Sequence, residues 1–259
     1  MTLAPLRRFA VGLAAVPLLL GSCEPQCAPA PPGPPRILEQ RQLGTSFEGR
    51  PIVAYRLGTP GATPVLAVGS IHGDEEAGIE IVEHLRDAAA IPAGLDVWIV
   101  PTINPDSNVH GFRTNVRGVD LNRNFPTNWA FVDCRALPRN CAGYEPLGEP
   151  ESRAFADFVT AVQPRLTIMY HGADHVVSAA TAIVASPAAV LAYADVSGYP
   201  LGSIPCSPAC TGTATQFTNA NVTPSTAFTV ELSTKAAGAM TTAGVASHAA
   251  AFWAAAAAV

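Results

Sequence analysis

The sequence lacks any stripe of basic residues that could follow a phosphate backbone. It has 15 Lys and Arg against 20 Asp and Glu, which gives a formal net charge of -5. Affinity for nucleic acid comes largely from Lys and Arg that neutralise phosphates. We therefore expect no nucleic-acid partner.

The sequence also lacks an internal repeat, and no linker interrupts it after residue 36. We therefore expect residues 37–259 to form one large domain. The stretch from Gly238 onward is rich in Ala, which raises hydropathy although each Ala buries little area. A terminal helix packed on a sheet is expected there, rather than a membrane span.

The apolar run near the N-terminus is too short for a membrane-spanning helix. It extends from Phe9 to Leu20 and follows two Arg, a pattern typical of an export signal. We predict that residues 1–22 are a signal peptide. Residues 23–36 follow as a Pro-rich, semi-rigid tether, with five Pro between Ala28 and Pro35.

Leu20-Gly21-Ser22-Cys23 resembles the lipobox of bacterial lipoproteins, in which the Cys is lipidated. A lipid on Cys23 would anchor the exported protein on the outer face of the cytoplasmic membrane, its only expected membrane contact. The alternative is ordinary signal cleavage and secretion, which leaves Cys23 free to pair with Cys27. Lipidation would leave Cys27 without that partner.

A zinc site at Cys206 and Cys210 would need two more soft ligands nearby, and none is apparent. The four Cys after Cys27 form two close sets, Cys134 with Cys141 and Cys206 with Cys210. Close pairs in Pro- and Gly-rich loops of an exported protein indicate disulfides that staple the loops. We predict both disulfides.

Apolar runs and helical patterns alternate along the rest of the chain. Strands are expected at Val65–Val68, Val97–Pro101, Leu166–Tyr170 and Phe228–Leu232, and helices at Ile79–Leu85 and Glu151–Val162. This order predicts an α/β fold with a mixed, mostly parallel central sheet and helices on both faces. The segment from Asn104 to Pro150 has little apolar periodicity, so we expect a long functional loop outside the core.

A His and a Glu stand three residues apart where the first of these strands ends and a helix is expected to begin with an acidic first turn. They are His72 and Glu75. Ligands of open α/β sheets bind at the carboxyl ends of strands, and imidazole with carboxylate is a common pair of zinc ligands. A solvated His beside an acidic helix start is the alternative interpretation. His171, at another strand end, is the expected third ligand, with His175 as its competitor.

A carboxylate stands inside the last apolar strand. Glu231 lies within Phe228–Leu232, and burying an unpaired carboxylate is costly. We therefore expect Glu231 to face a polar cavity, a bound water or a cation. A salt-bridged structural Glu is the alternative.

The predicted loop contains three Arg and three Asn between Gly111 and Pro126. Arg is suited to bidentate recognition of carboxylates. The run Gly118-Val-Asp-Leu-Asn-Arg-Asn-Phe125 resembles the signature of zinc carboxypeptidases of the carboxypeptidase A family. Together with the other three motifs, in the same order, the resemblance covers about Gln42 to Lys235.

The resemblance implies one zinc ion per chain, held by His72, Glu75 and His171. It also implies that Glu231 is the general base that activates the attacking water. Arg113 would stabilise the developing oxyanion.

Three further residues obtain roles from the resemblance. Asn122 and Arg123 would grip the terminal carboxylate of the substrate. Asp120 would orient His72, since a ligating His usually donates its other N–H to such a group. Arg117 has no counterpart and is expected to be a surface charge.

One departure concerns a Tyr that closes over the substrate in the larger digestive members of the family. Thr211 to Thr226 contains Phe217 but no Tyr. The short domain and the Cys206–Thr213 stretch look more like the bacterial branch that includes murein peptide amidases. In that branch the scissile bond joins γ-D-glutamate to a diamino acid.

We therefore expect an exported zinc metallopeptidase that cleaves a peptide bond beside a free carboxylate, in cell-wall (murein) peptides. The alternatives are a general metallocarboxypeptidase and an aspartoacylase-like zinc deacylase, which shares the zinc ligands and the base. The full Gly118–Phe125 run favours a peptidase over a deacylase. An inactive binding module would have lost a ligand or the base, and the sequence retains them all.

Overall fold

The computed structural model of the protein describes residues 37–179, 184–204 and 210–259. The predicted signal peptide, the tether and Cys23 lie outside these residues, and so does Cys206. Within the described ranges, no helix is both long enough and apolar enough to cross a membrane.

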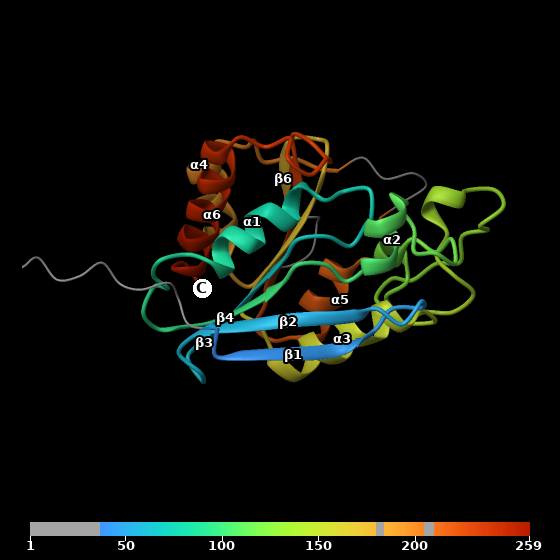
Figure 1. The fold of residues 1–259 in the computed structure, drawn as a ribbon, viewed down its shortest axis with the longest axis horizontal. Coiled ribbons are helices and arrows are strands. Elements are labelled where there is room, and N and C mark those ends of the chain that lie inside the picture. Colours follow the sequence, from blue (N-terminus) through green and yellow to red (C-terminus); the bar gives the residue numbers. More distant parts are fainter. Residues whose placement is uncertain (1–36, 180–183, 205–209) are drawn as a thin grey trace, which may run out of the picture. The chain divides into compact units, whose positions relative to one another are not determined.

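A mixed sheet forms the centre of the described domain (Figure 1). Its strands are β1 (Glu39–Thr45), β2 (Pro51–Gly58), β3 (Thr63–Val68), β4 (Leu95–Val100), β5 (Leu166–Gly172), β6 (Val176–Ser178) and β7 (Thr226–Leu232). They lie side by side in the order β1-β2-β4-β3-β5-β7-β6. The central strands β4, β3, β5 and β7 are parallel, while β1, β2 and β6 are antiparallel to their neighbours.

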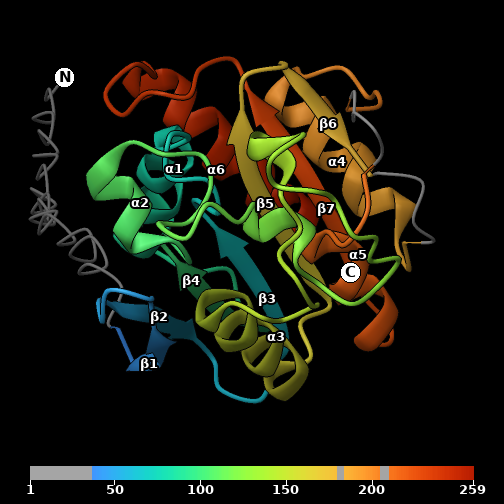
Figure 2. The same ribbon diagram turned by 90° about the vertical axis from the view of Figure 1, so that its right-hand side faces the viewer.

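Helices cover both faces of the sheet (Figure 2). They are α1 (Ala77–Arg86), α2 (Pro105–His110), α3 (Pro150–Val162), α4 (Pro187–Ser197), α5 (Ala214–Asn221) and α6 (Thr242–Ala256). One core contains buried residues of α1, α4 and α6, and the other contains residues of α3 and α5. Along β3, Val65 and Ala67 belong to the first core, whereas Leu66 and Val68 belong to the second, because successive side chains of a strand point to opposite faces. The predicted fold class is confirmed.

Helix α1 lies unusually close to the sheet because Gly78 has no side chain. A Cβ atom at Gly78 would stand 2.2 Å from the carbonyl oxygen of Gly69 and 2.4 Å from the Cβ of Tyr170. Gly69 follows β3, and Tyr170 lies in β5. The start of α1 is therefore held at the ends of these two strands.

The long loop between residues 104 and 150 contributes to the core, so the expectation that it lies outside is wrong. Leu121 and Phe125 are fully buried in the second core. Phe125 packs against Phe155 of α3 and Phe217 of α5, with ring centroids 6.0 and 5.6 Å apart. These few apolar residues have no periodicity because an irregular segment with only a three-residue 3-10 helix, Leu121–Arg123, carries them into the core.

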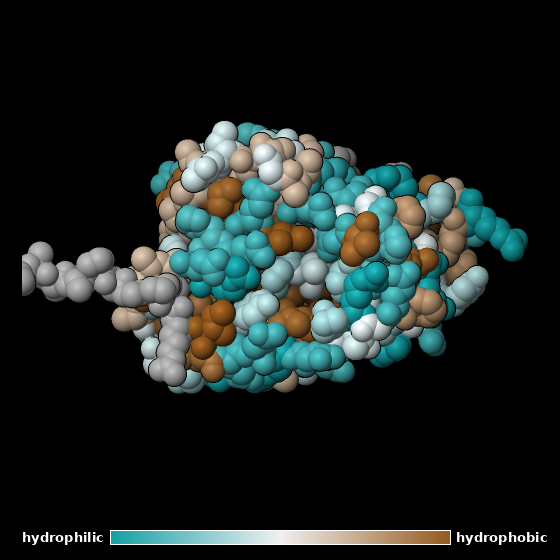
Figure 3. All heavy atoms as spheres, viewed as in Figure 1, coloured by the Kyte–Doolittle hydropathy of each residue, from teal (hydrophilic) through white to brown (hydrophobic). Residues whose placement is uncertain are grey.

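The Ala-rich C-terminal segment forms a helix, as predicted. It is α6, and its main neighbours are α4 and α1, with fewer contacts to β5. On the face shown in Figure 3, the described surface is largely hydrophilic, and apolar residues form separate patches.

Candidate metal centre

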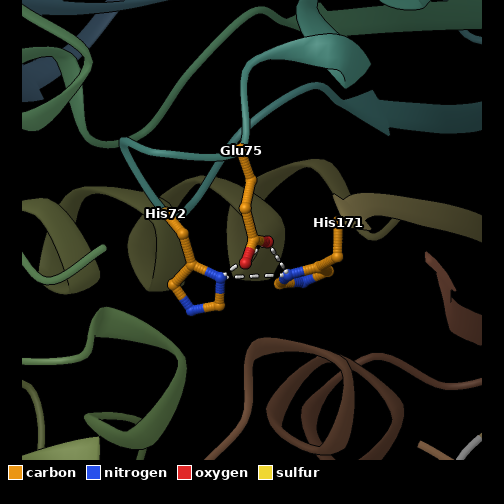
Figure 4. A group of neighbouring side chains, drawn as sticks. All are labelled: His72, Glu75 and His171. Atoms are coloured by element: carbon orange, nitrogen blue, oxygen red, sulfur yellow. Dashed lines mark hydrogen bonds and ion pairs between the residues drawn. The ribbon is translucent and has the colours of Figure 1, made fainter. Parts of the chain in front are cut away.

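Three ligand atoms converge at the ends of β3 and β5 (Figure 4). The Oε2 atom of Glu75 lies 2.9 Å from Nδ1 of His72 and 3.1 Å from Nδ1 of His171. The two Nδ1 atoms are 3.2 Å apart. All three side chains are buried, so the predicted ligands meet in one enclosed place.

The spacing and protonation of this group fit zinc. Ligand atoms that surround a tetrahedral zinc at about 2.0–2.1 Å lie about 3.3 Å from one another. Nε2 of His72 is 3.0 Å from Oδ1 of Asp120, and a carboxylate can only accept there, so Nε2 carries the proton. The lone pair of a neutral His72 is therefore on Nδ1, directed at the other two ligand atoms.

Asp120 has the geometry that its predicted orienting role requires. Besides facing His72, Oδ1 accepts the backbone N–H of Asn122 at 2.9 Å, and Oδ2 accepts from Arg113 at 3.1 Å. Burial by itself would raise the pKa of Asp120, but the adjacent His72 and Arg113 outweigh burial and hold that pKa below its usual range. Asp120 is therefore an anion that fixes the His72 ring.

The loop that carries His72 and Glu75 is held by its neighbours. Gly73 permits a close approach, since a Cβ atom there would stand 2.2 Å from the carbonyl carbon of Ser107. The carbonyl oxygen of Lys235 accepts the N–H groups of Glu76 and Ala77 at 2.7 and 3.0 Å. The sequence predicts that Asp74, Glu75 and Glu76 form the acidic first turn of this helix. In the structure α1 begins at Ala77, so these three residues precede the helix.

Arg113 lies directly beside the ligand group. Its Nη1 donates to Oε1 of Glu75 at 2.9 Å and lies 3.1 Å from Nδ1 of His72. Burial opposes the charge of this guanidinium, but Asp120 and Glu75 outweigh burial and raise the pKa of Arg113. A permanent cation therefore stands next to the three ligand atoms.

Glu231 faces the same side of the sheet as His171. The two residues are direct partners on the parallel strands β5 and β7, and partners in register point to one face. Glu231 is only 7% exposed, and burial raises the pKa of its carboxyl group. A carboxylate with a raised pKa is a better proton acceptor than an ordinary one.

A single cavity of about 360 Å³ gathers the predicted site residues. His72, Glu75, His171, Arg113, Asn122, Arg123 and Glu231 all line it, whereas Asp120 lies behind His72. His175 is not part of the ligand group, and its ring stacks on Tyr199 at 4.0 Å. Of the two candidates for third ligand, the geometry selects His171.

Arg123 places a buried cation in this cavity. It is 7% exposed, its Nη1 donates to the carbonyl oxygen of Asn122 at 2.8 Å, and its Nε has no partner among the described residues. Burial lowers the pKa of Arg123. The side-chain oxygen of Asn122 accepts the N–H of Ala214 at 2.9 Å, so both residues are fixed. A buried guanidinium with a free donor favours an incoming anion.

A disulfide supports the loop that carries these residues. It joins Cys134 to Cys141, and the carbonyl oxygen of Cys141 accepts the N–H of Asp120 at 2.8 Å. The pairing of Cys206 with Cys210 stays a prediction, because Cys206 lies outside the described residues.

Several residues that line the cavity have no local signal in the sequence. They are Asn140, Asp174, Ile204, Thr213, Thr215, Thr229 and Lys235. Among the described residues no Tyr lines the cavity. Phe217, the aromatic residue in the segment where the family has a Tyr, is 6% exposed and packs in the core. The role of that Tyr is therefore not taken over by Phe217.

Known proteins resemble this chain at the level of sequence. Residues 33–241 match the family described as zinc carboxypeptidase. A bacteriocin of Clostridium perfringens is 33% identical over 140 residues, which are 47% of this chain and 15% of that protein. Murein peptide amidase A of Escherichia coli is 29% identical over 139 residues, 49% of this chain and 57% of the amidase. The chain thus spans less than two thirds of the length of either relative.

Solved structures share the fold. A carboxypeptidase A from Helicoverpa armigera superposes with a TM-score of 0.71 at 17% identity, covering 86% of this chain and 68% of that one. A murein-tripeptide amidase from Escherichia coli gives a TM-score of 0.65 at 22% identity, covering 86% and 93%. Since the family match includes most of the described domain and the His–Glu–His group within it, the chain belongs to the zinc carboxypeptidase family.

Proposed function

We propose that the protein is a zinc-dependent peptidase that cleaves murein peptides at the bond between γ-D-glutamate and a diamino acid. The observation that carries this proposal is one cavity that contains the ligand group, the buried Glu231 and the buried Arg123. These groups provide a metal site, a proton acceptor and a receptor for a carboxylate. Hydrolysis of an amide beside a free carboxylate requires these three functions.

The residues divide the reaction between them. When bound to His72, Glu75 and His171, zinc supplies Lewis-acid polarisation of the scissile carbonyl. Glu231 accepts a proton from the attacking water and passes it to the leaving nitrogen. Arg113 stabilises negative charge as it develops on the carbonyl oxygen. Arg123, with Asn122, holds the free carboxylate of the leaving residue.

The polarity of the cavity supports a polar diamino acid as the leaving residue. The lining contains the hydroxyl-bearing Thr213, Thr215 and Thr229 together with Asn140 and Asp174, whereas Ile204 is its only large apolar residue among those described. An aromatic side chain would desolvate these groups without satisfying them. A side chain with its own ammonium and carboxylate groups can form hydrogen bonds with them. The similarity to a murein peptide amidase supports the same substrate class.

The proposed place of action is outside the cytoplasmic membrane. This part rests on the signal-like residues 1–22 and on Cys23, which follows a lipobox-like sequence. Mass spectrometry of the mature protein from membranes should find Cys23 at the N-terminus and carrying acyl chains. An unmodified Cys23 bonded to Cys27 would instead support a secreted form.

The substrate proposal is tested by comparing kcat/KM for L-Ala-γ-D-Glu-diaminopimelate with kcat/KM for hippuryl-type peptides, with and without a zinc chelator. We expect faster, chelator-sensitive cleavage of the murein tripeptide. Preference for the hippuryl peptides would make the protein a general carboxypeptidase. Preference for N-acyl amino acids over both would favour a deacylase.

The carboxylate receptor is tested with Arg123→Ala, and exposed Arg117→Ala in the same loop is the matched control. Loss of a charge-assisted contact to a buried carboxylate should cost about 2–5 kcal/mol in transition-state binding. The loss should be confined to substrates whose leaving residue has a free carboxylate, and the amidated analogues should change little. Equal losses on both kinds of substrate would contradict the assignment.

A further inference from the structure

Lys235 is a cation in the cavity for which the proposed mechanism has no role. Its ammonium group lies 3.0 Å from Oε1 of Glu75 and 3.7 Å from Oδ2 of Asp74. The side chain is 35% exposed and lines the same cavity as the ligand group. An ammonium group has three donors, and only the contact with Glu75 is within hydrogen-bonding distance among the described residues. Donors therefore remain for a ligand.

The position of Lys235 is fixed by the backbone. Its own carbonyl oxygen accepts two N–H groups at the start of α1, from Glu76 and Ala77. Gly172, which follows the ligand His171, allows the lysine to approach, since a Cβ there would stand 2.9 Å from Cγ of Lys235. The hydrogen-bonded backbone at Lys235 therefore holds the ammonium group beside the ligand group.

Lys235 and Arg123 reach the cavity from different parts of the chain and contact different residues. Lys235 follows β7 and contacts Glu75, whose Oε2 is one of the three convergent ligand atoms. Arg123 lies in the loop after α2, next to Asn122. Asp74, which neighbours Lys235, also lines a second cavity of about 280 Å³ with Phe112 and Arg139. Besides Arg113 and Arg123, the site therefore has a third cation, which is separate from the receptor for the leaving residue and near an adjoining cavity.

The linkage in a γ-glutamyl substrate supplies a second carboxylate. When glutamate is joined through its side chain, its α-carboxylate stays free on the acyl side of the scissile bond. That carboxylate is four bonds from the scissile carbonyl carbon, or about 5 Å in an extended chain with C–C bonds of about 1.5 Å. An ordinary peptide bond at the same place offers no charge. A cation beside the metal ligands can therefore distinguish the two linkages.

We propose that Lys235 binds the free α-carboxylate of the γ-linked acyl residue and so selects γ-glutamyl over α-linked substrates. This inference rests on the proposed function and adds a specificity determinant to it. Lys235 is thereby assigned to the acyl residue, and Arg123 to the leaving residue.

The test compares two murein tripeptides that differ at one group. The first contains γ-D-glutamate, and in the second the α-carboxylate is an amide, as in γ-D-isoglutamine. The wild-type enzyme should prefer the carboxylate form by about 10-fold in kcat/KM, an effect in the range of one charge-assisted hydrogen bond. Lys235→Met should abolish that preference by slowing only the carboxylate form, and Lys235→Arg should retain it.

Arg139→Met is the matched control, because Arg139 also lies close to Asp74, at 3.6 Å, but does not line the main cavity. It should keep the wild-type preference. The zinc content of every variant is measured in parallel, and Lys235→Met should keep its metal.

Each contrary result has a distinct meaning. If the wild-type enzyme cleaves both tripeptides equally well, the proposed function stands and the role of Lys235 is overturned. Loss of zinc from Lys235→Met would show that the lysine acts on Glu75 rather than on substrate. Cleavage of neither tripeptide would overturn the proposed function and the inference that depends on it.

Discussion

At the scale of single residues, one hydrogen bond decides which nitrogen of His72 can bind a metal. Asp120 is buried and anionic, and it accepts the proton of Nε2 at 3.0 Å. The lone pair is thus fixed on Nδ1, within 2.9 Å of Glu75 and 3.2 Å of His171. Such outer partners hold a ligating His in the correct tautomer and orientation. The protein's own side chains therefore orient the ligand group.

The first prediction concerns the metal ligands. His171→Ala removes one of three protein ligands and should lose most of the approximately one zinc ion per chain that we expect. His175→Ala should keep the wild-type content, because that exposed ring stacks on Tyr199 away from the ligand group. Metal analysis by mass spectrometry after dialysis measures both. Full zinc content in His171→Ala would refute the ligand assignment.

The second prediction concerns the proton acceptor. Glu231→Gln keeps the shape of the side chain and removes its basicity, so kcat should fall by roughly 100-fold or more. Zinc content should not change, because Glu231 is not one of the three converging ligands. Steady-state kinetics and metal analysis on the same sample check both points. If zinc and activity are lost together, Glu231 is a ligand or a structural group.

At the scale of secondary-structure elements, burial explains which strands the sequence predicts. Strands β3, β4, β5 and β7 are predictable because both of their faces are covered, which gives short and mostly apolar runs. No residue of β1 is fully buried, β2 mixes buried with partly exposed residues, and β6 has only three residues. Their signals are too weak to separate from loops.

The residues of the candidate site also differ in how far the sequence predicts them. His72, Glu75, His171 and Glu231 stand at strand ends or within a strand, so their position follows from local pattern once the sheet is expected. Lys235 and the cavity-lining Thr residues reach the site only through tertiary packing. Lys235 lies 160 positions from its partner Glu75, and no local spacing could relate the two.

The third prediction tests the contact between α1 and the sheet. Gly78→Ala would place a methyl group 2.2 Å from a backbone oxygen, so the helix must move. Overpacking of this kind costs about 1–3 kcal/mol of stability, and the movement should also weaken zinc binding. Chemical denaturation and zinc competition titrations measure the two effects.

Gly244→Ala in α6 is the matched control for this prediction. Its new methyl group would meet the Thr241 hydroxyl at 3.3 Å and the terminal methyl of Met240 at 3.6 Å, with no backbone atom outside its own helix within 4 Å, and Ala favours a helix over Gly by up to about 1 kcal/mol. The stability of the control should therefore stay the same or rise by up to about 1 kcal/mol. If Gly78→Ala behaves like this control, the close approach of α1 is not required for the site.

At the scale of the whole molecule, a buried polar network joins α4, α6 and β5. Tyr193 in α4 lies 2.8 Å from Nδ1 of His248 in α6 and 3.5 Å from the hydroxyl of Tyr170 in β5. Tyr199 packs edge-on against the His248 ring at 4.6 Å. Because Tyr170 directly precedes the ligand His171, the network connects the packing of the terminal helix to the strand that carries the site.

This network predicts how the stability of the whole fold depends on pH. Burial, with a smaller contribution from the nearby His175, lowers the pKa of His248 from 6.5 to about 4. Between these two values the unfolded chain binds more protons than the folded one, so the free energy of unfolding rises with pH. The contribution of His248 should be complete above about pH 6.5 and should disappear as the pH falls to about 4. Its size is about 3 kcal/mol, at 1.36 kcal/mol per pKa unit.

Urea denaturation of the wild type and of His248→Asn between pH 4 and 8 isolates this effect. The variant is expected to be less stable than the wild type at pH 7, because the substitution removes a buried ring that packs against Tyr193 and Tyr199. The difference between the two proteins should then shrink by about 3 kcal/mol on acidification, since only the wild type loses the His248 contribution. His84→Asn, at an exposed position of α1, should follow the wild-type curve, because solvent surrounds that ring in both the folded and the unfolded state. A constant difference between the wild type and His248→Asn would mean that His248 is protonated equally in both states. The buried network would then not make the stability of the fold depend on pH.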